Sequence, residues 1–442
     1  MSDFNTISDN DFMVEKIKER PINRKKLIRK TVITVTMAVI FGLVACVTFI
    51  SLEPIITNYL YPEEEAEVIT FPEDEEEMKP EDMLEEEIPV IESIPQEPVN
   101  TQLDQEQVDE ILNAVTLDKS HYLQLYDVMS EYVSELSQYM VTVTSVKEDF
   151  DWLENSYETT NNISGVVIAK NNKDIFILTD YTSLEGADEI YVTFYNGKER
   201  EANLLGAHSE VNIAVLNIPL EVYGTEDEVG KVAVAPLGSS RSYKMTGKPI
   251  VAMGSPMGMT DSIGYGIIAA MTEEVDTIDF NYDVIVTDIY GSPSAKGVLF
   301  NMQGQIIGII TSTKTNLDVK SIVTAYGISD LKQMISAISS EKEIPYLGIK
   351  GTDVEEDADQ EAQIPEGTYI LDVVMNSPAM LAGLQKGDII VGMDENTIED
   401  YADFARAMYG ATVGQTMTIT LMRPSQGTYK EMSMDVTLTS AN

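Results

Sequence analysis

The chain of 442 residues is poor in the residue types that build metal sites, redox sites and basic binding surfaces. It has one cysteine, Cys46, so no disulfide can form within the chain. Its two histidines, His121 and His208, lack the partner spacing of a zinc site, and we expect no metal and no cofactor. Basic residues are scarce, because 29 Lys and Arg stand against 74 Asp and Glu for a net charge of −45. So acidic a chain repels phosphate groups, and nucleic acid is not an expected partner.

One uncharged apolar run, residues 31–52, is long enough to cross a bilayer as a single helix. The tail before it, residues 1–30, carries the basic residues, and an acidic stretch follows. The positive-inside rule therefore predicts a single-pass protein of the cell membrane, with a cytoplasmic N-terminus and an extracytoplasmic bulk. As an alternative, Leu43 to Cys46 resembles a bacterial lipobox, in which Cys46 would be lipidated. The apolar run continues past Cys46, which favours the uncleaved anchor.

Two segments of different character follow the apolar run. Residues 53–102 are rich in Glu, Asp and Pro, and such a like-charged segment is expected to be a disordered linker. In residues 103–139 apolar residues recur at three- and four-residue steps, which predicts a helical segment. This helix would dock onto its own domain or onto a sister copy.

The rest of the chain is predicted to be mainly β. Residues 140–340 contain many short apolar runs separated by turns, which is typical of a closed or sandwiched antiparallel sheet. A helical run from Ile328 to about Ser339 closes this unit. Residues 344–442 form a second, smaller domain of strands with one clear helix, Tyr401 to Met408.

Residues 140–340 contain three motifs, at residues 177–187, 206–216 and 287–301, and their order along the chain is informative. They resemble the segments that carry the catalytic histidine, aspartate and serine of the HtrA/DegP family of trypsin-like serine proteases. The resemblance implies a chymotrypsin-like double β-barrel. At the three catalytic positions this chain has Thr182, Asn212 and Ala295.

These replacements remove the chemistry of the triad, which needs a nucleophile, a base and a carboxylate that orients the base. Thr182 is not basic at neutral pH, Asn212 is neutral, and the methyl group of Ala295 cannot attack a carbonyl. Pro293 stands where the family has the glycine whose N–H helps to bind the oxyanion, and proline has no N–H. The resemblance therefore implies a catalytically degenerate member, a pseudoprotease.

An active serine endopeptidase of this family with an atypical catalytic arrangement is the alternative. Ser292 and Ser294 lie beside the nucleophile position, and Lys296 could serve one of them as a base only if it were desolvated. We expect Lys296 to be a solvated loop lysine. We expect His208 to be exposed at the tip of a turn, and neither histidine to act as a base.

The C-terminal domain resembles the PDZ domain of HtrA proteases. Its signature is the run Tyr346 to Ile349 followed by S-P-A at 377–379, A-G-L at 382–384 and G-D-I-I at 387–390. The resemblance implies β-augmentation, in which an extended peptide pairs with a strand and backbone N–H groups hold its terminal carboxylate. The predicted peptide-binding residues are Tyr346, Leu347, Gly348, Ile349, Phe404 and Met408. For Phe404 and Met408, ordinary core packing is an equal alternative.

Together these features predict a membrane-anchored, extracytoplasmic HtrA-like pseudoprotease that binds polypeptides or protein C-termini through its PDZ domain. Such a protein would act in protein quality control or regulation in the bacterial envelope. A structural or sensory envelope subunit is a further alternative, and it differs in having no affinity for free peptides. The family resemblance also implies a homo-oligomer, namely a trimer, although no trimer contact is identifiable by motif.

Overall fold

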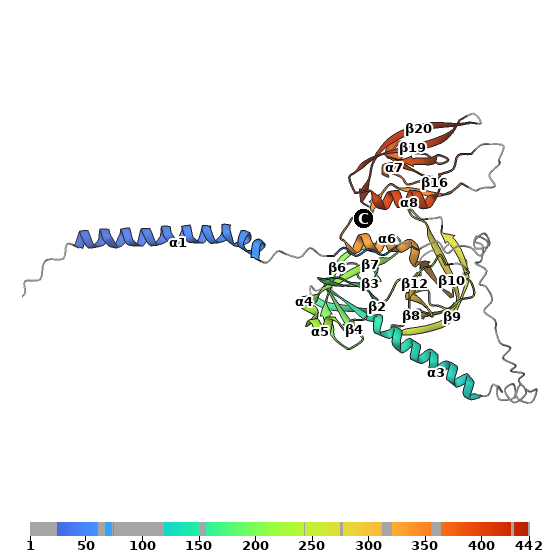
Figure 1. Cartoon of the computed structure of the whole chain (residues 1–442), viewed down its shortest axis with the longest axis horizontal. Coiled ribbons are helices and arrows are strands. Elements are labelled where there is room, and N and C mark those ends of the chain that lie inside the picture. The colour runs from blue at the N-terminus through green and yellow to red at the C-terminus, as the bar shows by residue number, and fades with distance from the viewer. Residues whose placement is uncertain are drawn as a thin grey trace, which may run out of the picture. The chain divides into compact units, whose positions relative to one another are not determined.

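A computed structural model describes ten parts of the chain (Figure 1). These are residues 24–60, 67–72, 74, 119–150, 156–242, 244–274, 277–311, 321–354, 364–425 and 428–440. The chain divides into two compact units, Met1–Glu65 and Ala66–Asn442.

In the first unit the structure describes the helix α1 (Arg24–Leu60). Within it, Arg29–Phe49 is a stretch of 21 residues with a mean hydropathy of 2.5, long and apolar enough to cross a membrane. The predicted anchor, residues 31–52, lies inside α1. The helix continues to Leu60, so the first residues of the predicted disordered linker are helical instead. Apolar residues such as Ile56 and Leu60 recur there before the acidic run begins, and they allow the helix to propagate.

The second unit contains a seven-stranded antiparallel sheet in the spatial order β5-β4-β1-β2-β3-β7-β6. Its strands are β1 (Met140–Phe150), β2 (Ser156–Lys170), β3 (Asp174–Asp180), β4 (Glu189–Phe194), β5 (Glu199–Glu201), β6 (Asn203–His208) and β7 (Ile213–Pro219). The short helices α4 (Leu220–Tyr223) and α5 (Glu226–Val229) follow. Alternate residues of β4 are buried, as its period-two pattern of apolar residues dictates.

A closed barrel in the order β10-β13-β12-β11-β8-β9 comes next. Its strands are β8 (Pro249–Ser255), β9 (Ser262–Glu274), β10 (Tyr282–Tyr290), β11 (Lys296–Asn301), β12 (Ile306–Thr311) and β13 (Ile322–Gly327). Gly297 in β11 has φ 123°, and a Cβ atom there would lie 2.1 Å from the carbonyl oxygen of Met253. Only glycine therefore lets β11 approach β8 this closely.

Two helices, α6 and α3, pack against these sheets (Figure 1). The helix α6 spans Ile328–Ser339, the range predicted from its apolar period, and it buries Leu331, Ile335 and Ile338. The helix α3 (Lys119–Leu136) continues into a 3-10 turn, η2 (Ser137–Tyr139), and enters β1. It covers the second part of the predicted helical segment 103–139, and residues 103–118 lie outside the described residues.

A short part of the predicted linker packs on this unit, which corrects the expectation that residues 53–102 are disordered throughout. Ile69 and Phe71 pack against the hydrophobic core. The carboxylate of Asp74 accepts hydrogen bonds from Ser239 Oγ at 2.8 Å and from Ser329 Oγ, and Lys332 Nζ lies 2.5 Å from it. Two apolar side chains and a paired carboxylate thus offset the entropy cost of ordering the segment.

The C-terminal domain is a sheet in the order β15-β16-β17-β19-β20, with β18 paired to β17. Its elements are β14 (Pro345–Tyr346), β15 (Ile349–Asp353), β16 (Thr368–Val373), α7 (Pro378–Ala382), β17 (Ile389–Met393), β18 (Asn396–Thr397), α8 (Tyr401–Gly410), β19 (Thr416–Ser425), β20 (Thr428–Thr437) and β21 (Thr439–Ser440). The mainly β prediction is confirmed, since the chain is 44% strand and 24% helix.

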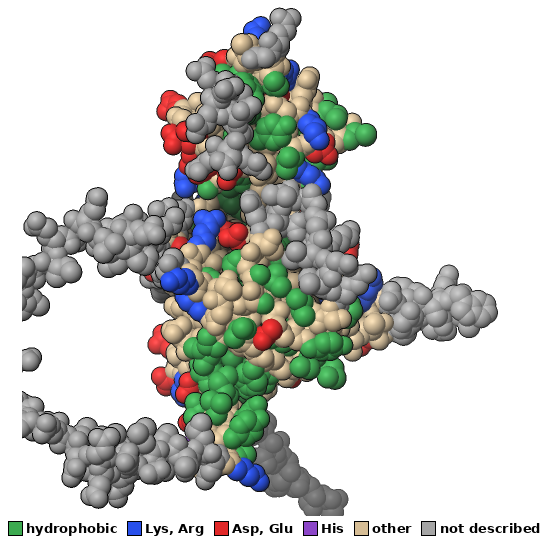
Figure 2. Space-filling model, turned by 90° about the vertical axis from the view of Figure 1, so that its right-hand side faces the viewer, with side chains coloured by type: hydrophobic (Ala, Val, Ile, Leu, Met, Phe, Trp, Pro, Cys, Tyr) green, Lys and Arg blue, Asp and Glu red, His purple; other side chains and the backbone are tan. Residues whose placement is uncertain are grey.

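One face of the second unit carries apolar side chains gathered in its lower half, as Figure 2 shows. The large apolar residues most exposed on α3 are Tyr122, Leu123, Leu125, Tyr126 and Val128. Large apolar side chains that remain in water mark surfaces that other molecules can cover.

Candidate functional site

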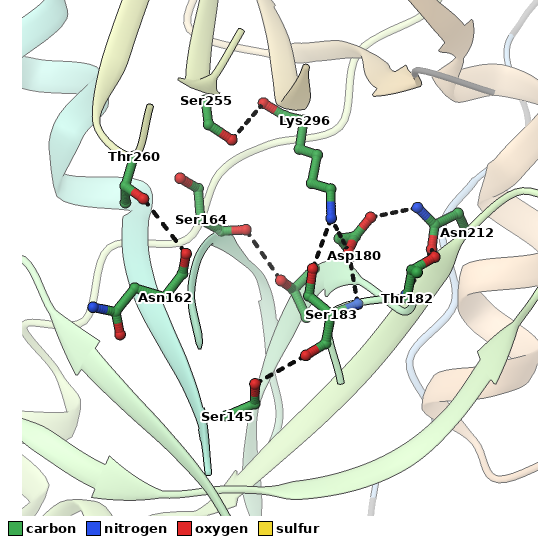
Figure 3. A network of polar contacts seen from close by, with 11 residues as sticks. Ser145, Asn162, Ser164, Asp180, Thr182, Ser183, Asn212, Ser255, Thr260 and Lys296 are labelled. Carbon is green, nitrogen blue, oxygen red and sulfur yellow. Dashed lines mark hydrogen bonds and ion pairs between the residues drawn. The ribbon is translucent and has the colours of Figure 1, made fainter. Parts of the chain in front are cut away.

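An ion pair occupies the junction between the two consecutive β sheets (Figure 3). Asp180 ends β3 of the first sheet, and Lys296 begins β11 of the closed barrel. Lys296 Nζ lies 2.5 Å from Asp180 Oδ1 and 2.7 Å from Ser183 Oγ. The Asp180 side chain is 8% exposed and the Lys296 side chain 25% exposed. At this burial each charge depends on the other, because an unpaired buried charge is costly.

Thr182 and Asn212, the predicted positions of the base and its orienting acid, are in contact. Asn212 Oδ1 accepts hydrogen bonds from Thr182 N at 2.7 Å and from Thr182 Oγ1 at 2.6 Å. Asn212 Nδ2 donates to Asp180 Oδ2 (Figure 3). The fold therefore brings these two positions together as a triad would require. The groups that meet there are a hydroxyl and an amide, and neither accepts a proton at neutral pH.

Ala295, at the predicted nucleophile position, is buried in the apolar cluster of the closed barrel and is 4% exposed. Its backbone N–H donates to the carbonyl oxygen of Ser292 at 2.9 Å. In an oxyanion hole, the N–H at this position and the N–H two residues earlier would point to the substrate. Here the first N–H is bonded within the loop, and the second position is Pro293, which has none.

Ser292 and Ser294 are bonded to one another instead of to a base. Their Oγ atoms lie 3.0 Å apart, and Ser292 Oγ also accepts from Ser294 N at 3.2 Å. Lys296 Nζ contacts Asp180 and Ser183 (Figure 3). The expectation that Lys296 is a solvated loop lysine is therefore wrong, because its side chain is held in a partly buried ion pair.

The hollow beside this ion pair is lined by Asp180, Asn212 and Lys296 among others, and its volume is about 30 Å³. A cavity of this size holds a water molecule but not a peptide side chain.

His208 lies at the end of β6 and is 6% exposed, so the expectation of an exposed imidazole at a turn tip is wrong. Its position is set by the pairing of His208 with Ile213 on β7, which turns the ring into the protein. Burial lowers the pKa of His208 to about 4, because the interior penalises the charged imidazolium. His208 is thus neutral at physiological pH and lies on a different strand from the ion pair.

The predicted carboxylate-binding loop holds a carboxylate from elsewhere in the chain. The backbone N–H groups of Leu347, Gly348 and Ile349 donate to the side chain of Asp279 at 2.8 to 2.9 Å. Gly348 has φ 87°, and a Cβ atom there would lie 2.2 Å from Ser377 Cβ. The loop geometry that points three N–H groups inward therefore requires glycine at this position.

The side chains predicted to line the peptide groove are in the hydrophobic core. Leu347, Ile349, Phe404 and Met408 are each 0% exposed and belong to one apolar cluster. Tyr346 is half-buried and pairs with β21 through Thr439. The structure thus brings the six predicted residues together around the loop, but it leaves no open apolar pocket between those four side chains.

Comparison with known proteins identifies the two domains. Models of the trypsin-like peptidase domain and the PDZ domain match residues 163–309 and 345–438. The serine protease Do-like HtrA of Bacillus subtilis (strain 168) is 29% identical over 334 residues, which cover 70% of this chain and 72% of that protein. The serine protease Do-like HtrB of the same organism is 29% identical over 297 residues, or 62% of each chain. The chain is thus HtrA-like, with a trypsin-like peptidase domain followed by a PDZ domain.

A variant of the HtrA-type protease AlgW, solved with a tripeptide, shares the fold of this HtrA-like chain. The match covers 71% of this chain and 98% of that one, with a TM-score of 0.52 and 23% sequence identity. The prediction of a trypsin-like domain followed by a PDZ domain is thereby confirmed.

Two contacts of this HtrA-like chain were not predicted from its sequence, the ion pair of Asp180 with Lys296 and the binding of Asp279 by the loop 347–349. Only the first could have been inferred from the sequence. Asp180 and Lys296 lie in two of the three motifs, residues 177–187 and 287–301, and carry opposite charges. Charge complementarity could have paired them. Asp279 lies in no motif, and its partners are reached only when two domains pack together.

Proposed function

We propose that this HtrA-like protein is a pseudoprotease, a binding protein that retains the protease fold without its activity. The observation that carries the proposal is the ion pair of Lys296 with Asp180, beside the contact of Thr182 with Asn212. An ion pair fills the place where a catalytic centre needs a free base and space for substrate. The two N–H groups of the oxyanion hole are also unavailable, one bonded to Ser292 and one missing at Pro293.

An atypical active centre would need Lys296 to act as a base for Ser183, whose Oγ lies 2.7 Å from Nζ. A lysine base must lose its proton, and desolvation or a neighbouring positive charge promotes that loss. Here Nζ lies 2.5 Å from the carboxylate of Asp180 and is engaged in an ion pair. The contact therefore favours a structural lysine over a catalytic one.

We further propose that α1 anchors the chain in the cytoplasmic membrane of a bacterium, with the HtrA-like domains outside. The apolar stretch Arg29–Phe49 supports this, together with the basic residues before it and the acidic ones after it. The exposed apolar side chains of α3 support self-association, because a second copy could cover them.

The proposed activity is binding of polypeptide C-termini or unfolded segments through the PDZ domain, in quality control or regulation at the bacterial envelope. The loop 347–349 supports it, because three converging N–H groups hold a carboxylate in the structure itself. A terminal carboxylate presents the same two oxygens to such a loop.

The experiment that tests the loss of catalysis uses the full chain in detergent micelles. Labelling by a serine-reactive fluorophosphonate and cleavage of unfolded casein are compared with a variant that carries Ser183→Ala, Ser292→Ala and Ser294→Ala. We expect equal, background signals from both proteins, with chymotrypsin as the positive control. Cleavage by the natural chain that the triple variant loses would refute the proposal and make Ser183 the first nucleophile to examine.

A further inference from the structure

The loop that precedes β10 presents an acidic residue and then an aromatic one to the PDZ domain. Asp279 is 1% exposed and Phe280 is 3% exposed. The Asp279 carboxylate accepts from Leu347 N at 2.8 Å, from Gly348 N at 2.9 Å with both oxygens, and from Ile349 N at 2.9 Å. Three consecutive N–H groups thus share one carboxylate, which is how the end of a peptide chain would be held.

The backbone around Asp279 also pairs with the PDZ domain at the start of β15. Asp279 N donates to Ile349 O at 2.8 Å, and Asn281 Nδ2 donates to Gly351 O at 2.9 Å. In its sheet β15 has a strand neighbour on one side only, β16. The two hydrogen bonds therefore engage the edge to which an added peptide strand would pair.

Phe280 supplies the apolar part of the contact. Its ring stacks on Tyr409 of α8, with ring centroids 4.3 Å apart and an interplanar angle of 25°. It belongs to the same apolar cluster as Leu347, Phe404 and Met408. An aromatic side chain next to a carboxylate thus lies between the loop and α8, the place expected for the last side chain of a bound peptide.

We infer that Asp279 and Phe280 are an internal pseudoligand that occupies the peptide site of the PDZ domain. This inference deepens the proposed peptide binding and rests on it. A free C-terminus then competes with a segment of the same chain, and it binds only after that segment leaves the loop. The measured affinity is the intrinsic affinity multiplied by the fraction of molecules in which the loop is open. Binding of a peptide and release of the segment before β10 are consequently one event.

The pseudoligand carries costs that make it displaceable. Asp279 has φ 62°, a left-handed conformation that a residue with a side chain adopts with strain. Burial raises the pKa of Asp279 to about 6, against the lowering effect of the three N–H groups, and the charge of Glu210 raises it further. A peptide carboxylate can form the same three hydrogen bonds without the strained backbone.

The test measures peptide binding by the full chain in detergent micelles. The probe is a library of fluorescein-labelled decapeptides whose last three residues are drawn from Val, Ile, Leu and Phe, titrated by fluorescence polarisation. The same library with amidated C-termini reports on the carboxylate. Asp279→Ala removes the pseudoligand carboxylate. Asp261→Ala is the matched control, because Asp261 is exposed and also has a left-handed backbone, with φ 61°.

We expect Asp279→Ala to bind the free-acid library about tenfold more tightly than the natural chain, and Asp261→Ala to match the natural chain. Equal, measurable affinity of the natural chain and Asp279→Ala would overturn the inference while leaving peptide binding in place. Absence of binding to all three proteins would overturn the inference and the proposed peptide binding together.

A second measurement needs no variant and guards against an Asp279→Ala protein that folds poorly. Hydrogen exchange of the natural chain is followed with and without saturating library. We expect faster exchange at the Asp279 amide when peptide is bound, since its bond to Ile349 O is lost. Peptide binding that leaves this amide as protected as before would overturn the inference.

Discussion

The ion pair between Asp180 and Lys296 lends itself to a double-mutant cycle whose outcome follows from burial. Lys296→Met keeps the aliphatic stem but leaves the carboxylate of Asp180, 8% exposed, without its cation. Removing one partner of a fully buried pair costs about 3 to 5 kcal/mol. Asp180 keeps two donors, Ser183 N at 3.0 Å and Asn212 Nδ2, so we expect the lower part of that range, about 3 kcal/mol.

The second single variant, Asp180→Asn, should cost less, about 1 to 2 kcal/mol, because the Lys296 ammonium is 25% exposed and can reach water. The double variant has no buried charge left at this place. We therefore expect it to be about 2 kcal/mol more stable than the sum of the single effects predicts.

The assay is urea unfolding of the full chain in detergent micelles near neutral pH, followed by far-UV circular dichroism. The matched control is the cycle on Arg406 and Asp403 of α8, a pair 2.7 Å apart whose side chains are 58% and 27% exposed. Its coupling should stay within about 0.5 kcal/mol. A coupling for Asp180 and Lys296 no larger than that of the control would refute the reasoning from burial.

Two further predictions concern pH and the docked segment. His208 has a pKa lowered by burial from 6.5 to about 4, so its stabilising contribution is complete above pH 6.5 and is lost as the pH falls toward 4. At pH 5 the loss is about 2 kcal/mol, and His208→Gln should abolish it in unfolding experiments while His121→Gln leaves it intact. Asp74→Asn leaves Lys332, whose side chain is 7% exposed, without its carboxylate at a cost of about 3 kcal/mol. Calorimetry should show the midpoint of this domain lowered by about 5 °C or more, and an unchanged midpoint would contradict the ion pair.

The parts of this protein that depend on local sequence pattern could be predicted from the sequence. The apolar period of residues 328–339 gives the bounds of α6, and the motif order anchors Thr182, Asn212 and Ala295 in the fold. The contact of Thr182 with Asn212 also follows from that order, since the family motif implies that these positions meet.

What the sequence did not predict depends on contacts between distant elements. The burial of His208 follows from the pairing of β6 with β7 and not from its own neighbours. Lys296 and Asp180 are separated by 116 positions and meet only when two sheets pack. Asp279 meets Leu347 across 68 positions and a domain boundary, and an isolated acidic residue in a turn gives no hint of that.

The docked residues 67–72 and 74 give the chain a point of attachment to the second unit before α3 begins. Asp74 is held on the second unit, and the chain returns to the same unit where α3 begins at Lys119. The second unit is thus contacted by Asp74 and again by the end of α3, where Val133 and Leu136 are buried. The closure entropy between two such points depends only weakly on the number of residues that separate them, about 0.6 kcal/mol for a doubling. A change in that number should therefore leave the contacts of Asp74 with Ser239, Ser329 and Lys332 in place.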